Sequence, residues 1–278
     1  MKIMSEGLEK TAGDRLRGVL SSMTSNRFAG VLTGMGVTAV IQSSSATTVM
    51  VVSFVNAGLM TLRQAIGVIM GANIGTTVTA WIVAFIGFKM DIAALSLPLM
   101  AVAAPLLFMG KGKWKNLGEC IIGFALLFMG LNLLSEAAEA MEIGKHMGDW
   151  LTHIDVNAWW AIPLFLFAGM ILTMAMQSSS ASMAITLMLF DMNIPGFGLA
   201  QAAALAMGQN IGTTITALLA SFAGNNQAKR AAVAHTLFNV FGVIIILCIF
   251  PLSIKATVEL DKVIFGDSSN NMYLLSIF

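Results

Sequence analysis

Two short polar runs could bind ions, because each places an amide and three hydroxyls inside a long uncharged segment. They read QSSS at 42–45 and again at 177–180. Each run directly precedes an apolar stretch, ATTVMVV or ASMAITL, so a serine hydroxyl can cap the start of a helix. The N–H groups and positive dipole of a helix start suit an anion, whereas neutral oxygens suit a hard cation such as Na⁺. The pattern therefore indicates joint binding of an anion and a small cation.

A second phrase follows each serine run, GANIGTTVTA at 71–80 and GQNIGTTITA at 208–217. Gly75 and Gly212 are flexible points, so we expect each helix to unwind there and to present polar groups at the break. Together the four segments predict a midplane pocket for a tetrahedral oxyanion and hard cations. The side chains expected to line this pocket are Gln42, Ser43, Ser44, Ser45, Asn73, Thr76 and Thr77 in the first copy, and Gln177, Ser178, Ser179, Ser180, Asn210, Thr213 and Thr214 in the second.

Serine and threonine also serve as small packing residues in membrane helices. The paired recurrence of QSSS with NIGTT disfavours that interpretation for these segments. His235, near the start of a later apolar helix, is by contrast interpreted as a structural or interfacial residue rather than a ligand. The sequence holds no zincin, nucleophile-elbow, Walker or Rossmann motif. We therefore predict that the protein is not an enzyme and has no cofactor, with Na⁺ as a coupling ion.

The composition predicts a membrane protein. Hydrophobic residues make up 57% of the 278 residues and charged residues only 10%, against about 25% in soluble domains. No Asp, Glu, Lys or Arg lies centrally in a candidate membrane segment, which disfavours a proton relay. With a net charge of +1, the lipid bilayer is the expected partner and nucleic acid is not.

The polar phrases recur in the same order, which predicts a duplicated unit. The offset is 135 residues from Gln42 to Gln177 and 137 residues from Asn73 to Asn210. A third echo, MSEGLEK at 4–10 against LSEAAEA at 134–140, precedes the serine runs. We expect repeat 1 over 1–110 and repeat 2 over 111–278. Symmetry further predicts a membrane helix upstream of MSEGLEK.

Segment lengths predict the elements of each repeat. The apolar stretch 28–41 would span about 21 Å as a helix and is too short to cross a bilayer. We therefore expect re-entrant hairpins, which enter the membrane and return on the same side. The full expectation is a hairpin at 28–60, a broken helix at 64–88, crossing helices at 92–110 and 117–135, a hairpin at 157–190, a broken helix at 198–223 and a crossing helix at 231–250.

Three predicted crossings separate the serine runs, and an odd number turns the second repeat upside-down. This topology places eleven Lys and Arg residues on the side of the N-terminus and four on the other. Because basic residues prefer cytoplasmic loops, we expect a cytoplasmic N-terminus and a multi-pass protein of the plasma or inner membrane. The predicted fold is an all-α membrane protein of two inverted-topology repeats, each with a re-entrant helical hairpin and a broken transmembrane helix. Such broken helices are typical of transporter binding sites.

The motifs resemble the type II sodium/phosphate cotransporter family, particularly its bacterial branch. The resemblance lies in QSSSATTVMVV with GVIMGANIGTTVTAW, in QSSSASMAITL with LAMGQNIGTTITAL, and in KRAAVAHTLFNVFGV at 229–243. It implies Na⁺-driven uptake of inorganic phosphate across the plasma membrane by alternating access. It also implies that the motif residues above hold phosphate and Na⁺ between them. The expected sodium ligands are Gln42, Ser45, Thr77, Gln177, Ser180 and Thr214.

Two other functions remain open at the level of sequence. Hydroxyls and helix starts are only moderately selective, so the substrate could be another oxyanion, such as sulfate or a dicarboxylate. A non-transporting membrane protein that senses phosphate is the alternative from a different class. The chain is expected to be a monomer or a homodimer.

Overall fold

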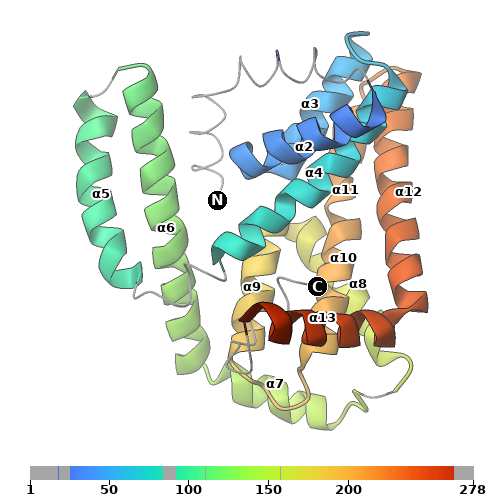
Figure 1. The fold of residues 1–278 in the computed structure, drawn as a ribbon. Coiled ribbons are helices and arrows are strands. Elements are labelled where there is room, and N and C mark those ends of the chain that lie inside the picture. The colour runs from blue at the N-terminus through green and yellow to red at the C-terminus, as the bar shows by residue number, and fades with distance from the viewer. Residues whose placement is uncertain (1–17, 19–25, 84–91, 110, 157, 266–278) are drawn as a thin grey trace. The chain divides into compact units, whose positions relative to one another are not determined.

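The computed structural model describes residues 18, 26–83, 92–109, 111–156 and 158–265, and all regular elements in these ranges are helices (Figure 1). The predicted all-α class is therefore confirmed for the described residues. Two expectations fall elsewhere in the chain. The MSEGLEK segment and the last part of the helix expected at 64–88 lie outside the described residues.

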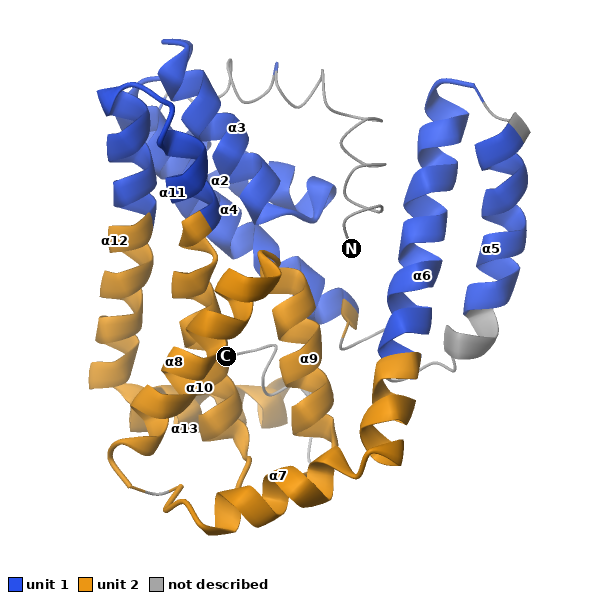
Figure 2. Ribbon diagram, turned by 180° about the vertical axis from the view of Figure 1, so that it is seen from behind, with its two compact units in different colours: residues 1–82, 86–132, 216–235 blue, residues 83–85, 133–215, 236–278 orange. Residues whose placement is uncertain are grey.

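Contacts divide the chain into two compact units (Figure 2). Unit 1 comprises residues 1–82, 86–132 and 216–235, and unit 2 comprises residues 83–85, 133–215 and 236–278. Each unit contains one QSSS run and the Asn-Ile-Gly-Thr-Thr phrase of the same copy. These units are defined by contacts rather than by ancestry, so the repeat boundary near residue 110 stays a prediction.

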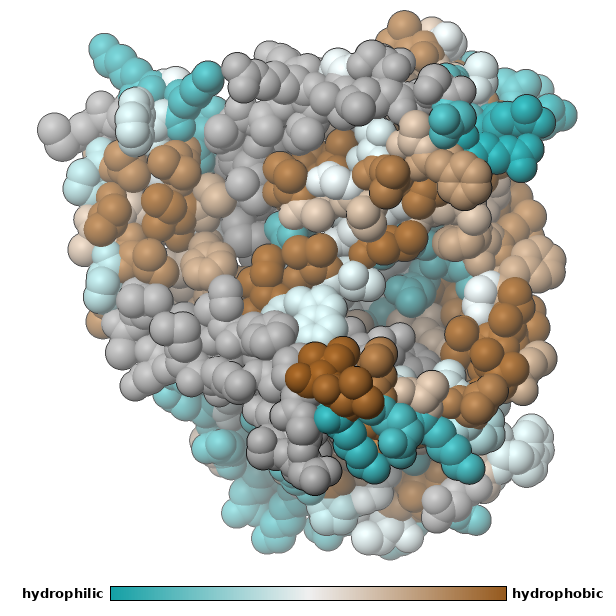
Figure 3. Space-filling view, in the orientation of Figure 1, coloured by the Kyte–Doolittle hydropathy of each residue, from teal (hydrophilic) through white to brown (hydrophobic). Residues whose placement is uncertain are grey.

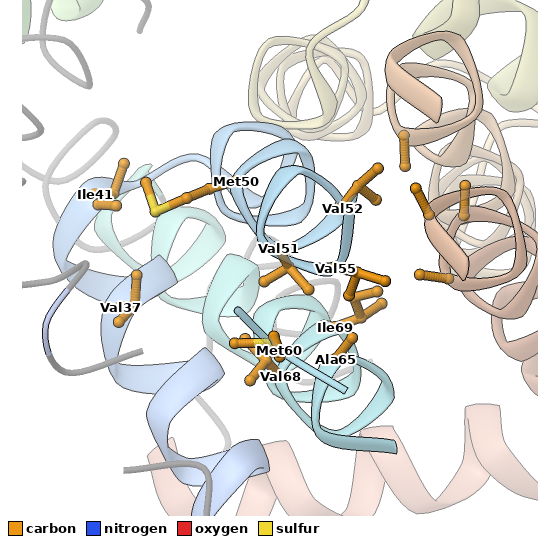
Figure 4. Packing of buried hydrophobic residues seen from close by; sticks show 14 residues of the cluster. Val37, Ile41, Met50, Val51, Val52, Val55, Met60, Ala65, Val68 and Ile69 are labelled. Atoms are coloured by element: carbon orange, nitrogen blue, oxygen red, sulfur yellow. The ribbon is translucent and has the colours of Figure 1, made fainter. Parts of the chain in front are cut away.

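Unit 1 is built around three helices at its N-terminal end, α2 (Arg27–Ile41), α3 (Ser44–Asn56) and α4 (Leu62–Ile82). Valine, isoleucine and methionine side chains from these helices form its core, and small alanines from two later helices complete it (Figure 4). Those helices are α11 (Thr214–Ser221) and α12 (Asn226–Cys248). The unit also holds α5 (Ile92–Met109) and most of α6 (Lys113–Ala140).

Unit 2 repeats the three-helix plan with α8 (Ala161–Met176), α9 (Ser179–Asp191) and α10 (Leu199–Gly212). Two helices in this unit were not expected from the sequence, α7 (Ile143–Thr152) and α13 (Phe250–Phe265). Both contain charged residues and are too short to cross a membrane, so neither resembles the uncharged windows on which the sequence interpretation relied.

In the described part of the chain, three helices, α4, α6 and α12, are long and apolar enough to cross a membrane. Exposed apolar helix surfaces fit lipid contact. The outer side of α5, for example, exposes Leu97, Val102 and Phe108, and Figure 3 shows this apolar surface with hydrophilic side chains at one end. Lys111 and Lys113 supply the charge at that end, and the exposed Trp114 lies beside them. An apolar band flanked by lysine and tryptophan is typical of a membrane–water interface.

The expected break in the first long helix is wrong. Helix α4 runs without interruption from Leu62 to Ile82 and passes straight through GANIGTT. The threonine hydroxyls of this phrase bond to carbonyls of the same helix, with Thr76 Oγ1 donating to Ala72 O at 3.1 Å and Thr77 Oγ1 donating to Ile74 O at 2.8 Å. Its glycines act as points of close packing rather than as breaks.

Close glycine packing joins the outer helices of each three-helix group. A Cβ atom at Gly34 or Gly71 would overlap the backbone of the facing helix, α4 or α2. Gly169 and Gly208 make the same close approach between α8 and α10 in unit 2. The overlapped carbonyl oxygens are those of Val68 and Val31 in unit 1 and those of Leu205 and Leu166 in unit 2. These pairs match under the sequence offsets of 135 and 137, so the two copies pack in the same way at backbone level.

The second expected break is present but slight. Helix α10 ends at Gly212 and α11 starts at Thr214, and the intervening Thr213 keeps helical dihedral angles of −57° and −28°. The helix pairs expected at 28–60 and 157–190 are present as α2–α3 and α8–α9. Whether these pairs are re-entrant, and whether the two repeats are inverted in a membrane, stay predictions.

Candidate substrate and ion site

The first QSSS run forms a tight turn between α2 and α3. Gln42 ends α2 in the left-handed conformation with φ 58°, and its N–H donates to Thr38 O at 2.7 Å. Ser43 is then extended and caps α3, with its Oγ accepting a hydrogen bond from Ala46 N at 3.2 Å. The predicted helix start at the serine run is therefore confirmed, and it depends on residues only three positions apart.

The second run repeats this turn closely. Gln177 has φ 50° and donates from its N–H to Thr173 O at 2.7 Å. Ser178 caps α9 by accepting from Ala181 N at 3.3 Å. Four described residues other than glycine have positive φ, and two of them are Gln42 and Gln177. A left-handed non-glycine residue costs on the order of 1–2 kcal/mol and persists only where the surrounding structure holds it.

The two motif glutamines have different surroundings. Gln42 is buried, its Nε2 donates to Ala39 O, and its Oε1 accepts from Thr79 Oγ1 at 2.8 Å. Gln177 is exposed within the structure. The amide of Gln42 is thus already engaged by α4, whereas the amide of Gln177 is accessible to a solute. Thr79 lies just beyond the NIGTT phrase, and sequence reasoning did not select it.

The remaining serines occupy the first turn of each second helix. Ser44 and Ser180 are buried, whereas Ser45 and Ser179 are partly buried. Their backbone N–H groups lack partners within the helix, as is general for a first turn. The Oγ atoms of the capping serines, Ser43 and Ser178, accept from N–H groups and so keep their own hydrogens for donation. Each turn therefore offers donors suited to an anion.

The last threonine of each Asn-Ile-Gly-Thr-Thr phrase offers oxygen lone pairs instead. Thr77 on α4 is exposed, and its hydroxyl hydrogen is used by Ile74 O. Thr214 starts α11 and donates to Ile211 O at 2.8 Å in the same way. A hydroxyl that already donates can still coordinate a cation, but it has no hydrogen left for phosphate. That Thr77 and Thr214 are sodium ligands stays a prediction.

The motif asparagines differ between the copies. Asn73 is partly buried, and its Oδ1 lies 3.4 Å from Nε2 of the buried His235 on α12. Asn210 is exposed, and Thr213 beside it is buried. The structural interpretation of His235 is consistent with its burial. Its proximity to a motif residue 162 positions away is a feature that the sequence did not indicate.

Within unit 1, Gln42 contacts α4 and Asn73 lies beside His235. Within unit 2, the segments Gln177–Ser180 and Asn210–Thr214 belong to the same compact unit. The described residues contain no group of three or more His, Cys, Asp or Glu side chains that could hold a metal ion. The polar chemistry of the motif segments is therefore that of amides, hydroxyls and helix ends.

A sequence profile of the Na⁺/Pi-cotransporter family matches residues 1–136 and 139–266. The chain belongs to the Na⁺/Pi-cotransporter family. YqeW of Bacillus subtilis (strain 168) is 36% identical over 249 residues, which cover 89% of this chain and 77% of YqeW. YjbB of Escherichia coli (strain K12), named for inorganic phosphate export, is 32% identical over 247 residues, 88% of this chain and 43% of YjbB.

A third relative in this cotransporter family is the human sodium-dependent phosphate transport protein 2B. It is 53% identical over 64 residues, which are 23% of this chain and 9% of that protein. The chain thus spans less than half the length of YjbB and a small part of protein 2B. No solved structure matches the chain. Family membership and membrane-length helices together assign the chain to a family of membrane transporters of phosphate.

Proposed function

We propose that this protein is a secondary active transporter that takes up inorganic phosphate across the plasma membrane with Na⁺. The observation that carries the proposal is the pair of matching QSSS turns, each with a serine-capped helix start. Family membership supports phosphate as the anion, and the name of protein 2B supports sodium dependence. The neutral oxygens of Thr77 and Thr214 suit Na⁺ more than they suit a proton.

The ligands of phosphate and of sodium are assigned by the hydrogen-bonding capacity of each group. Phosphate is bound by the first-turn N–H groups and by hydroxyls that keep their hydrogens, on Ser43 to Ser45 and Ser178 to Ser180. Sodium is bound by oxygen lone pairs, with Gln42, Ser45, Thr77, Gln177, Ser180 and Thr214 as the proposed ligands, so Ser45 and Ser180 would contact both ions. Binding both charges at once lets the cation offset the repulsion that phosphate would meet among carbonyl and hydroxyl oxygens.

We further propose that the repeats are inverted in the membrane, that the paired helices α2–α3 and α8–α9 are re-entrant hairpins, and that the N-terminus is cytoplasmic. Exchange of access between the two sides would then occur by movement of the repeats around the bound ions. The expected repeats are those at 1–110 and 111–278. A monomer or a homodimer would serve this mechanism.

The direct test is uptake of ³²P-phosphate into proteoliposomes with an imposed inward Na⁺ gradient. We expect uptake with Na⁺ outside, little uptake when K⁺ replaces Na⁺, and weaker competition by sulfate than by arsenate. Uptake that is equally fast in K⁺, or transport of sulfate in place of phosphate, would refute the proposal. Phosphate binding without any flux in either direction would instead favour a sensor.

A double variant tests the site itself. Ser44→Ala with Ser179→Ala should abolish uptake while the protein still inserts and elutes as one species. Ser53→Ala is the matched control, because Ser53 is exposed on α3 and its hydroxyl donates to Val49 O within its own helix. Uptake at the control's rate in the double variant would show that the serine runs only pack.

Phosphate export is the second candidate direction, because YjbB matches most of this chain and is named for export. The same proteoliposomes test whether efflux of phosphate is coupled to Na⁺. Vesicles loaded with ³²P-phosphate and placed in Na⁺-free buffer should lose label when the internal medium contains Na⁺ and should retain it when the internal medium contains K⁺. Efflux that is independent of Na⁺ would favour an exporter of another mechanism.

A further inference from the structure

Unit 2 contains a buried polar contact between α9 and α10 that unit 1 lacks. Gln209 of α10 is only 2% exposed, and its Nε2 donates to Thr186 Oγ1 at 2.7 Å and to Ser182 O at 3.2 Å. Under the offsets of the two repeats, Thr186 corresponds to Val51 and Gln209 to Ala72. Both of those residues are apolar and buried in unit 1. The two copies therefore differ in chemistry where their backbones agree.

The orientation of the Gln209 amide is fixed by its neighbours. Thr186 Oγ1 donates its hydrogen to Ser182 O at 3.1 Å, so it can only accept from Gln209. Ser182 O is likewise an acceptor, and both contacts therefore require the Nε2 end of the amide. The carbonyl oxygen Oε1 must point away from α9.

Two oxygens in this region are buried without a hydrogen-bond partner among the described residues, Gln209 Oε1 and Thr173 Oγ1. Thr173 is fully buried in the last turn of α8. Its counterpart in unit 1 is satisfied, because Thr38 Oγ1 donates to Thr47 Oγ1 at 3.0 Å. In unit 2 the corresponding Ser182 hydroxyl donates to Ser178 O at 3.0 Å, as Thr47 donates to Ser43 O at 3.1 Å, but Thr173 Oγ1 makes no hydrogen bond to it. Buried polar groups are rarely left unpaired unless an ion, a ligand or a water molecule completes them.

The two oxygens belong to the same junction of α8, α9 and α10. A Cβ atom on Gly212 would lie 3.1 Å from Thr173 Cβ, which places Thr173 against the last turn of α10. Gln209 is in that same turn, three residues before Gly212. The carbonyl end of the α8 dipole favours positive charge at this point. An amide carbonyl and a hydroxyl are oxygen ligands of the kind that hard cations take, and an anion would be repelled by Oε1.

We propose that Gln209 Oε1 and Thr173 Oγ1 bind one Na⁺ ion inside unit 2, at a site that unit 1 does not duplicate. Neither residue belongs to the QSSS or Asn-Ile-Gly-Thr-Thr positions assigned to the transport site. The role of this ion in coupling rests on the proposed function, but its binding does not. Because the two copies differ here, unit 2 would bind one Na⁺ ion that unit 1 does not bind.

Equilibrium binding of ²²Na⁺ to the purified full chain in phosphate-free detergent solution tests the site, with choline as the replacement cation. Gln209→Leu and Thr173→Val should each lose one saturable ion, or weaken its binding about 10- to 100-fold, the range found when metal-site partners are removed. Gln209→Glu keeps an oxygen at this position and should bind at least as tightly as the wild type. Thr38→Val is the matched control in unit 1 and should bind the wild-type number of ions.

Several outcomes would overturn the site. An unchanged number and affinity of ions in both Gln209→Leu and Thr173→Val would mean that a buried water completes the two oxygens. An equal loss in Thr38→Val would show that the effect is not local to unit 2. The binding result also separates this site from the proposed function. If the protein binds Na⁺ at this site but shows no Na⁺-driven phosphate uptake, the transport proposal is refuted and the site is kept. If the protein transports phosphate with Na⁺ but the variants bind Na⁺ as the wild type does, the site is refuted and the transport proposal is kept.

Discussion

Replacement of Gln177 by glycine should make the protein more stable and inactive at the same time. Gln177 adopts φ 50°, which costs a non-glycine residue on the order of 1–2 kcal/mol and costs glycine almost nothing. About 0.4–1 kcal/mol of this gain in stability is lost, because glycine raises the conformational entropy of the unfolded chain. The exposed Gln177 side chain is not part of the core. The net expectation is a gain of roughly 0.5–1 kcal/mol, or about 2 °C in the melting temperature of a chain of this size.

The same change at Gln42 should have the opposite sign. The backbone strain is similar, with φ 58°, but Gln42 Oε1 accepts from the buried Thr79 hydroxyl. Removal of that acceptor leaves a buried hydroxyl unpaired, which costs about 1–3 kcal/mol. Gln42→Gly should therefore be less stable than the wild type by about 1 kcal/mol, after the relief of strain is subtracted.

Thermal unfolding of the purified variants measures the stability and proteoliposome uptake measures the function. Glu142→Gly is the matched control, because Glu142 also has positive φ, at 48°, and lies at the start of α7 outside the motifs. It should gain stability and keep full uptake. A lower melting temperature for Gln177→Gly would refute the strain argument. Uptake at the wild-type rate in that variant would show that the Gln177 amide does not contact substrate or sodium.

Two further predictions concern packing and topology. Gly34→Ala should destabilise α2 against α4 by 2 kcal/mol or more, because the new methyl overlaps Val68 O, and its yield of monodisperse protein should fall. Gly36→Ala, with open space around it, should gain up to about 1 kcal/mol from helix propensity, and similar yields for the two variants would contradict the packing argument. For topology, an impermeant maleimide should label Lys145→Cys but not Lys113→Cys in intact cells, in a background that lacks Cys120 and Cys248. Labelling of both on the same side would contradict the inverted arrangement.

The sequence alone determined the features that depend on composition and on near neighbours. Low charge and long apolar windows indicated an all-helical membrane protein, and the family followed from motifs that recur in order. The helix starts at Ser43 and Ser178 were predictable because an N-cap is formed between residues three positions apart. The same local chemistry acts in both copies, so the two turns agree in their dihedral angles as well as in their letters.

Only the tertiary structure decided how each polar residue is used. Gly75 looked like a point of unwinding, but it packs closely against α2 and α4 stays helical, and a sequence window cannot show which surface a glycine faces. Gln42 and Gln177 are identical in type and local backbone, yet Thr79, 37 positions away, engages only Gln42. Neither Gln209 nor Thr173 was selected from the sequence, and only the folded structure shows that an oxygen of each is buried without a partner. Contacts between distant residues, rather than local preference, separate the amides that the protein engages from those that stay accessible.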